Sequence, residues 1–75
     1  MKELVETIVT SLVDYEDAVK VNQVDGTTST IIEVQVNKDD VGKVIGKNGN
    51  TAKSIRTLLK AVGKKNNRKY NLSIL

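Results

Sequence analysis

The sequence predicts an α+β fold with the element order αββααβ, in which a three-stranded mixed sheet carries three helices on one face. Three segments have apolar residues at helical spacing, and three others alternate apolar with polar residues. An Asp25-Gly26 turn signal separates the first two alternating segments, which indicates an antiparallel hairpin. The last alternating segment, residues 70–75, follows a helical crossover that is long enough for parallel pairing.

The N-terminal half is expected to form a helix over residues 2–13 and then the hairpin. The helix is indicated by an apolar stripe consisting of Leu4, Val5, Ile8, Val9, Leu12 and Val13. A polar link over 14–18 precedes the first strand, 19–24, and the clearest strand covers 30–36. Every other residue of that second strand is apolar, so one face should lie against the core. This apolar face consists of Ile32, Val34 and Val36.

The C-terminal half is expected to contain two helices. Asp39 or Asp40 can cap a short helix over residues 40–45. A longer helix is expected over 50–62, with Asn50 as its N-cap. The residues of this helix that should face the core are Ala52, Ile55, Leu59 and Val62.

The long helix is expected to end at Gly63, which stands where a C′ glycine would allow the chain to turn. Residues 63–69 should then form a polar, basic loop before the final strand at 70–75. On charge alone, a solvated connection explains this loop better than a binding surface does.

The composition excludes several classes of function. At 75 residues, the chain suits one domain covering residues 1–75. It contains neither Cys nor His, so we expect no disulfide, no metal site, no cofactor, and no catalysis by Cys or His. No apolar run approaches the roughly 18 residues that span a bilayer, and no signal peptide is visible. We therefore expect a cytoplasmic protein that is not an enzyme and has no membrane partner.

The charge is unevenly distributed along the chain. Residues 1–37 carry two basic and seven acidic side chains, whereas residues 38–75 carry ten basic and two acidic ones. Basic charge gathered in one half is typical of proteins that bind a polyanion. A solvated, lysine-rich helix face would produce the same count, so the charge alone leaves both interpretations open.

A glycine-rich stretch lies inside the basic half, at Val44-Ile45-Gly46-Lys47-Asn48-Gly49-Asn50. Gly46 and Gly49 can adopt positive φ, and the expected helix N-terminus after them favours an anion. Lys47 and Lys53 add positive charge beside this turn. Two glycines at this spacing can also form nothing more than a tight turn. A Walker A loop is excluded, because the glycine spacing is too short and Asn48 replaces the Ser or Thr that holds magnesium.

The V-I-G-K-N-G run at 44–49, followed by Ala52 and Ile55, resembles the V-I-G-x-x-G-x-x-I-x-x-I signature of KH domains. Ala52 stands where many KH domains have Ile, which implies a shallower groove wall. In KH domains the G-x-x-G loop clamps about four single-stranded nucleotides. The whole chain is similar to the small bacterial single-domain KH proteins of the KhpA family, which implies a type II KH domain.

The resemblance implies a single-stranded RNA-binding protein that acts as a post-transcriptional regulator or RNA chaperone. The expected RNA-binding residues are Lys43, Val44, Ile45, Gly46, Lys47, Asn48, Gly49, Asn50, Lys53 and Arg56. The groove should run between the two C-terminal helices and their loop on one side, and strand 30–36 with loop 63–69 on the other. The resemblance also implies a homodimer, or a heterodimer with a larger KH-containing protein.

The alternative hypothesis is a protein-interaction module in which the KH frame docks a partner protein. Salt separates the two hypotheses, because phosphate binding weakens steeply with ionic strength and an apolar protein interface does not.

Overall fold

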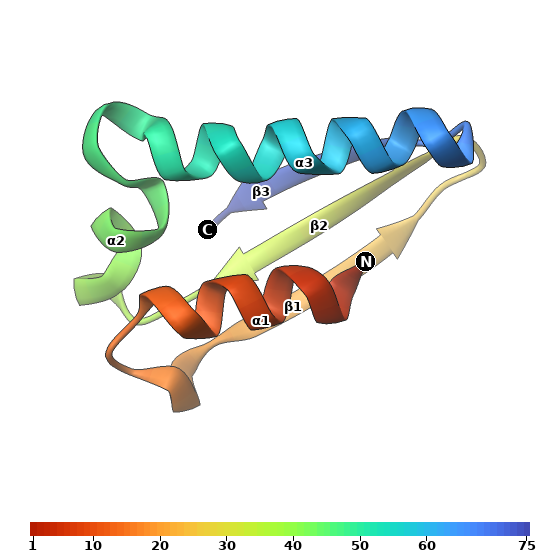
Figure 1. Ribbon diagram of the computed structural model, residues 1–75. Helices are drawn as coiled ribbons and strands as arrows, with labels where there is room; N and C mark the ends of the chain where they lie inside the picture. Colours follow the sequence, from red (N-terminus) through yellow and green to blue (C-terminus); the bar gives the residue numbers. More distant parts are fainter.

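The computed structural model describes residues 1–75 and confirms the predicted order αββααβ (Figure 1). The elements are α1 (Lys2–Leu12), β1 (Lys20–Asp25), β2 (Ser29–Gln35), α2 (Val41–Ile45), α3 (Asn50–Asn66) and β3 (Lys69–Ile74). Short 3₁₀ turns at Glu16–Ala18, Lys38–Asp40 and Lys47–Gly49 join them. No helix combines the length and the apolar character that crossing a bilayer requires.

The three strands form one mixed sheet in the order β1-β2-β3. β1 and β2 are antiparallel, with Val21 opposite Val34, as the turn signal predicted. β2 and β3 are parallel, with Ile32 opposite Leu72, so the predicted crossover through α3 is also confirmed. β2 is therefore the central strand, and β3 is the edge strand against which α3 packs.

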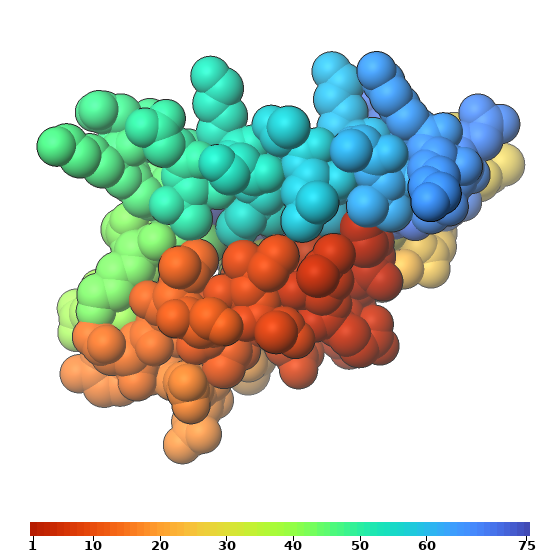
Figure 2. Space-filling view, in the orientation of Figure 1, coloured from red at the N-terminus to blue at the C-terminus, as the bar shows by residue number.

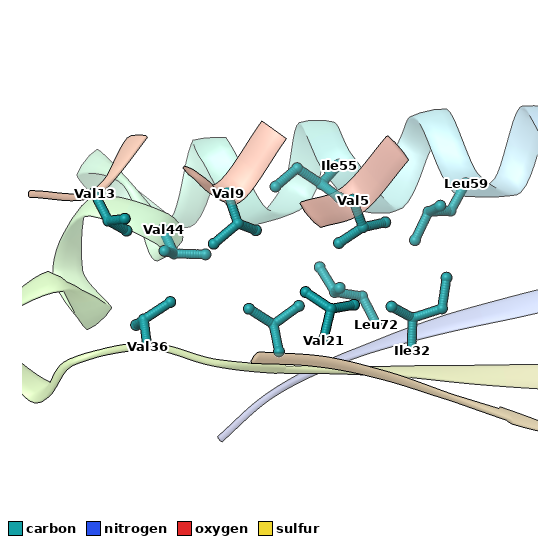
Figure 3. Packing of buried hydrophobic residues seen from close by; sticks show 11 residues of the cluster. Val5, Val9, Val13, Val21, Ile32, Val36, Val44, Ile55, Leu59 and Leu72 are labelled. Carbon is teal, nitrogen blue, oxygen red and sulfur yellow. The ribbon is translucent and has the colours of Figure 1, made fainter. Parts of the chain in front are cut away.

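One face of the sheet carries the hydrophobic core, and the helices cover that face (Figure 3). Val5 and Val9 from α1, Ile32 from β2 and Leu59 from α3 are at most 1% exposed. Each such aliphatic side chain contributes about 1.5–3 kcal/mol when it is fully buried. The opposite face of the sheet is exposed to solvent. Val24 on β1, for example, is 54% exposed.

The apolar stripes of the two long helices are narrower than the sequence suggests. Leu4 on α1 is 41% exposed and Leu58 on α3 is 42% exposed, although both follow the helical period. A helix that rests on a flat sheet buries only the side chains that point at it, so residues at the margin of the stripe stay in solvent.

The predicted end of α3 was wrong, because the helix continues through Gly63 to Asn66. Asn67, with φ 55° and ψ 43°, is the left-handed residue that ends the helix. The N–H of Arg68 then donates to the carbonyl of Gly63 at 2.8 Å. A Cβ on Gly63 would lie 2.3 Å from the Arg68 carbonyl oxygen, so glycine permits a close approach here rather than a positive φ.

The expected basic loop over 63–69 is correspondingly short, since only Asn67 and Arg68 connect α3 to β3. The Arg68 guanidinium is not free in solvent. It donates to the Thr30 hydroxyl at 2.6 Å and to the carbonyls of Gly26 and Ser29 at 2.6 and 3.1 Å. Arg68 therefore fastens the β1–β2 turn to the start of β3.

The start of α2 also differs from the prediction. The Asn37 side chain, rather than a carboxylate, accepts a hydrogen bond from the N–H of Asp39 at 2.9 Å. Asp40 makes no capping bond with α2. An amide oxygen satisfies the free N–H of a helical turn as well as a carboxylate does, and this leaves Asp40 for another role.

Asp40 is fully buried and joins the end of α1 to the start of α2. Its carboxylate accepts hydrogen bonds from the backbone N–H groups of Tyr15 at 3.0 Å and Asp14 at 3.3 Å. The Lys43 ammonium lies 3.4 Å from the same carboxylate. Burial alone would raise the pKa of Asp40, but the two N–H groups and Lys43 outweigh it and lower the pKa below its ordinary value.

Replacing Gly63 with Ala should destabilise the protein by about 1–3 kcal/mol, because the added methyl group would collide with the turn into β3. Gly42→Ala is the matched control, since a Cβ at this other helical glycine would meet nothing within 4 Å. That change should be neutral or should stabilise by up to about 1 kcal/mol through helix propensity. Urea denaturation of both variants measures the difference. Equal stability of Gly63→Ala and wild type would contradict the packing described for Gly63.

Replacing Asp40 with Asn should destabilise the protein most at neutral pH. Because its folded pKa is below the ordinary value of 3.8, the charged form stabilises the fold above that value, and this contribution is lost as the pH falls. The difference in unfolding free energy between wild type and Asp40→Asn should therefore stay constant at neutral pH and shrink once the pH falls below 3.8 and through the lower folded pKa. Asp39→Asn removes an exposed carboxylate and is the control. Parallel stability curves for wild type and Asp40→Asn would refute the assignment.

Candidate nucleic-acid interface

The loop between α2 and α3 adopts the backbone conformation that its glycines allow. Gly46 has φ 81° and ψ 171°, and Gly49 has φ 76°. Asn48 also has a positive φ of 58°, which Asn tolerates better than most residues. The predicted N-cap was wrong, because Gly49 occupies that position and Asn50, with φ −66°, is already helical. No side chain caps the N-terminus of α3.

The two glycines of the loop are required for different reasons. A Cβ on Gly46 would lie 2.1 Å from the Thr51 hydroxyl and 2.8 Å from the Thr51 backbone nitrogen. A Cβ on Gly49 would meet nothing within 4 Å, so only its positive φ favours glycine. The N–H of Gly49 donates to the Gly46 carbonyl at 3.1 Å, which closes the turn. The loop is thus packed directly onto the first turn of α3.

The lysines around the loop are not equivalent. The Lys43 ammonium is paired with the carboxylates of Asp14 and Asp40. The hydrogen bond to Asp14 is the main cause that raises the Lys43 pKa. Lys47 and Lys53 are exposed and make no ion pair, so their charge is available to an anion. Lys43 therefore has a structural role that the sequence did not predict.

The two apolar residues before the loop point in different directions. Val44 is fully buried and lies in the core among residues of α1 and α3 (Figure 3). Ile45 is 38% exposed. Val44 consequently anchors the loop to the core, whereas the side chain of Ile45 is accessible to a ligand.

A groove of about 620 Å³ lies between α3 and β3. We call it the α3–β3 groove, and its lining includes Arg56, Lys60, Lys64, Lys69 and Tyr70. No residue of strand 30–36 lines this groove, because that strand is central in the sheet and β3 occupies the edge.

Arg56 is the one predicted site residue that lines this groove. Lys60 and Lys64 also line the groove, although neither was among the predicted site residues. Lys64 was expected in a loop, because the helix was predicted to end at 62. In the observed helix Arg56, Lys60 and Lys64 recur every four residues, which places them on one face of α3. Figure 2 shows α3 running along the surface beside α1, with the loop at one end of it.

The chain matches the model of the KhpA/KhpB KH-domain family over residues 2–74. A relative from Borreliella burgdorferi is 55% identical over 73 residues, which are 97% of this chain and 89% of its own. Relatives from Clostridium perfringens and Clostridium acetobutylicum are 52% and 49% identical over the full length of both chains. All three are named RNA-binding protein KhpA. No solved structure matches the chain significantly.

The fold agrees with this similarity. The order αββααβ, the mixed three-stranded sheet and the three helices correspond to a type II KH domain. The loop with its two glycines lies between α2 and α3, where a KH domain carries it. The match over nearly the whole chain and the agreement of the fold together show that this chain belongs to the KhpA/KhpB KH-domain family.

Proposed function

We propose that residues 1–75 act as one KH unit that binds single-stranded RNA in the cytoplasm, without catalysis. The observation that carries the proposal is the geometry of the loop, in which Gly46 packs against Thr51 and no side chain caps α3. Backbone N–H groups at such a helix start attract a phosphate. The relatives named RNA-binding protein KhpA support RNA as the source of that phosphate.

The proposed contacts divide into phosphate and base contacts. Lys47 and Lys53, which make no ion pair, hold the phosphates together with the backbone of the loop. Ile45 supplies an apolar surface for a base, and Arg56 extends the site into the α3–β3 groove. The residues proposed to contact RNA are Ile45, Gly46, Lys47, Asn48, Gly49, Asn50, Lys53 and Arg56. Lys43, through its ion pairs on the surface, and Val44, in the core, hold the loop in place.

We further propose that the unit works as a post-transcriptional regulator or RNA chaperone, and that it pairs with itself or with a larger KH-containing protein. The exposed side chains of Leu4 on α1 and Leu58 on α3 support pairing. Two linked KH units would bind RNA more tightly than one, because the second contact becomes intramolecular. The alternative, a unit that docks a partner protein without RNA, would use the same apolar side chains and would tolerate salt.

Changing Lys47 and Asn48 together to Asp should abolish RNA binding and preserve the fold. Both side chains are exposed, and two carboxylates there would repel phosphate at the point of closest approach. Lys20→Asp with Asn22→Asp is the control, since it applies the same change of charge to exposed residues of β1. Fluorescence anisotropy with a short RNA measures affinity, and circular dichroism checks folding. Unchanged affinity in the folded loop variant would eliminate this loop as the binding site.

The affinity for RNA should fall as the salt concentration rises, with a shallow slope of log K against log salt. Each phosphate neutralised on a single strand contributes about −0.7 to the slope of log K against log salt, so a clamp on about three phosphates predicts a slope near −2. Lys53→Ala should reduce the slope by less than about one unit and weaken two unrelated oligonucleotides equally.

Lys65→Ala is the control for this experiment, because Lys65 is an exposed residue of α3 outside the groove lining. A Lys53 variant that weakens only one of the two oligonucleotides would show that Lys53 reads bases. Binding that does not respond to salt would favour the protein-docking alternative.

A further inference from the structure

Asn48, in the loop between α2 and α3, is the one asparagine of this chain that a glycine follows directly. Asparagine is a thermolabile residue, because the backbone nitrogen of the next residue can attack its side-chain amide. A glycine leaves this nitrogen accessible, since it has no side chain. The Asn48-Gly49 pair is therefore the place in the chain where this reaction meets the least steric resistance.

The structure leaves the Asn48 side chain accessible. It is exposed, and its amide takes part in none of the side-chain hydrogen bonds of the fold. A Cβ on Gly49 would meet nothing within 4 Å, so no other residue shields the peptide on that side. The Gly49 N–H donates to the Gly46 carbonyl at 3.1 Å. Attack requires this bond to open, because it engages the attacking nitrogen.

Asn67 provides a comparison within the same molecule. Both asparagines are exposed and left-handed, with φ 58° and ψ 24° at Asn48 and φ 55° and ψ 43° at Asn67. Asn67, however, is followed by Arg68, whose N–H donates to the Gly63 carbonyl at 2.8 Å. The guanidinium of Arg68 is also bound to the β1–β2 turn. The backbone after Asn67 is therefore both shielded and fastened, whereas the backbone after Asn48 is neither.

Asp25 is the acidic residue that precedes a glycine, and it could in principle form the same ring. Its carboxylate accepts hydrogen bonds from the Thr30 hydroxyl at 2.8 Å and from the Gln23 amide at 3.0 Å. These bonds hold the group in place, and a carboxylate resists attack by a nucleophile because of its negative charge. The comparison leaves Asn48 as the reactive position.

The reaction needs water and no other reagent. The Gly49 nitrogen gives up its proton and forms a bond to Asn48 Cγ, while the bond from Cγ to Nδ2 breaks and the nitrogen leaves as ammonia. Water then opens the cyclic succinimide at either of its carbonyl carbons. The products are aspartate, or isoaspartate with the main chain routed through the side chain. One water is consumed in place of the ammonia released, and nothing is oxidised or reduced.

The surroundings of the loop favour this chemistry. α3 begins without a side-chain cap, so its N-terminus carries a partial positive charge. Lys47 adds an exposed ammonium that makes no ion pair. Both stabilise the negative charge that develops during attack. They also stabilise the carboxylate of the product, since an acidic side chain is favourable at a helix N-terminus.

We propose that Asn48 is a site of spontaneous deamidation, which places a carboxylate where the loop presents its free N–H groups to an anion. The new charge offsets that of Lys47 and repels a phosphate at the start of α3. This effect on RNA rests on the proposed function, since the loop must bind RNA for the carboxylate to weaken it. RNA bound at the loop keeps the turn closed and slows the reaction.

Incubation of the folded protein in mildly alkaline buffer tests the site itself. Peptide mapping by mass spectrometry should find the mass increase of an amide-to-carboxyl change at Asn48 and not at Asn67. Isoaspartate methyltransferase should label the same peptide. Urea-unfolded protein gives the reference rate, because the turn is absent from it. Equal modification of the two asparagines in the folded protein would overturn the proposal, as would an intact Asn48 once the unfolded chain has fully reacted.

Fluorescence anisotropy with a short oligouridylate tests the consequence for binding. Modified protein, separated by ion exchange, should bind at least about tenfold more weakly than fresh protein and keep a native circular dichroism spectrum. Asn48→Asp should reproduce this loss. Asn48→Gly accepts a positive φ and has no amide, so its own affinity should not change during the incubation. Asn67→Gly is the matched control and should lose affinity as fast as wild type.

The outcomes separate this inference from the proposed function. If fresh protein binds no RNA, the proposed function fails, while the mass measurement still decides the modification site. If fresh and modified protein bind RNA equally, RNA binding stands and the inferred effect of the carboxylate is refuted. An excess of oligouridylate during the incubation should slow the modification of Asn48. An unchanged rate with bound RNA would show that RNA does not close the turn, and would refute that part of the proposal.

Discussion

The position of the glycine loop depends on the buried carboxylate of Asp40. This one group accepts the N–H groups of Asp14 and Tyr15 at the end of α1 and lies beside Lys43 on α2. α2 has only five residues, which is too few for a helix to be stable without tertiary contacts. The hydrogen bonds of Asp40 and the packing of Val44 in the core hold α2 in place. These contacts thereby also fix the position of the loop that follows α2. A charge that would be costly to bury alone thereby becomes the anchor of the candidate site.

The sequence predicts those features that arise from local chemistry. Element order, the hairpin and the positive φ of Gly46 and Gly49 follow from periodicity and from what glycine allows. The features that the sequence did not predict correctly depend on contacts between residues that are distant in the chain. Gly63 looks like a helix end, yet its role is set by a carbonyl that approaches only once β3 has paired. The strand that lines the α3–β3 groove could not be read from the sequence, because strand order in the sheet is a property of the whole fold.

Counting charges could not distinguish the two kinds of basic residue in this chain. Lys43 and Arg68 look like their neighbours in the sequence. Lys43, however, pairs with the distant Asp14 as well as with Asp40, and Arg68 donates to the distant Gly26 and Thr30. Once these two are set apart, four of the remaining cations of α3 and β3 line the groove, namely Arg56, Lys60, Lys64 and Lys69. The positive charge of these four side chains is therefore not neutralised by ion pairs within the protein.

The contact between Gly46 and Thr51 has a consequence for selectivity. A loop that packs against the helix it precedes has little conformational entropy to lose when a ligand binds. The free-energy cost of ordering the loop is therefore smaller than it would be for a flexible loop. The same rigidity prevents the loop from adapting its shape to different bases. It is suited to recognise the regular spacing of a sugar–phosphate chain, which every RNA shares. Under the proposed function, discrimination among RNAs would fall to side chains outside the loop, so homologous proteins could change their targets there while keeping the loop constant.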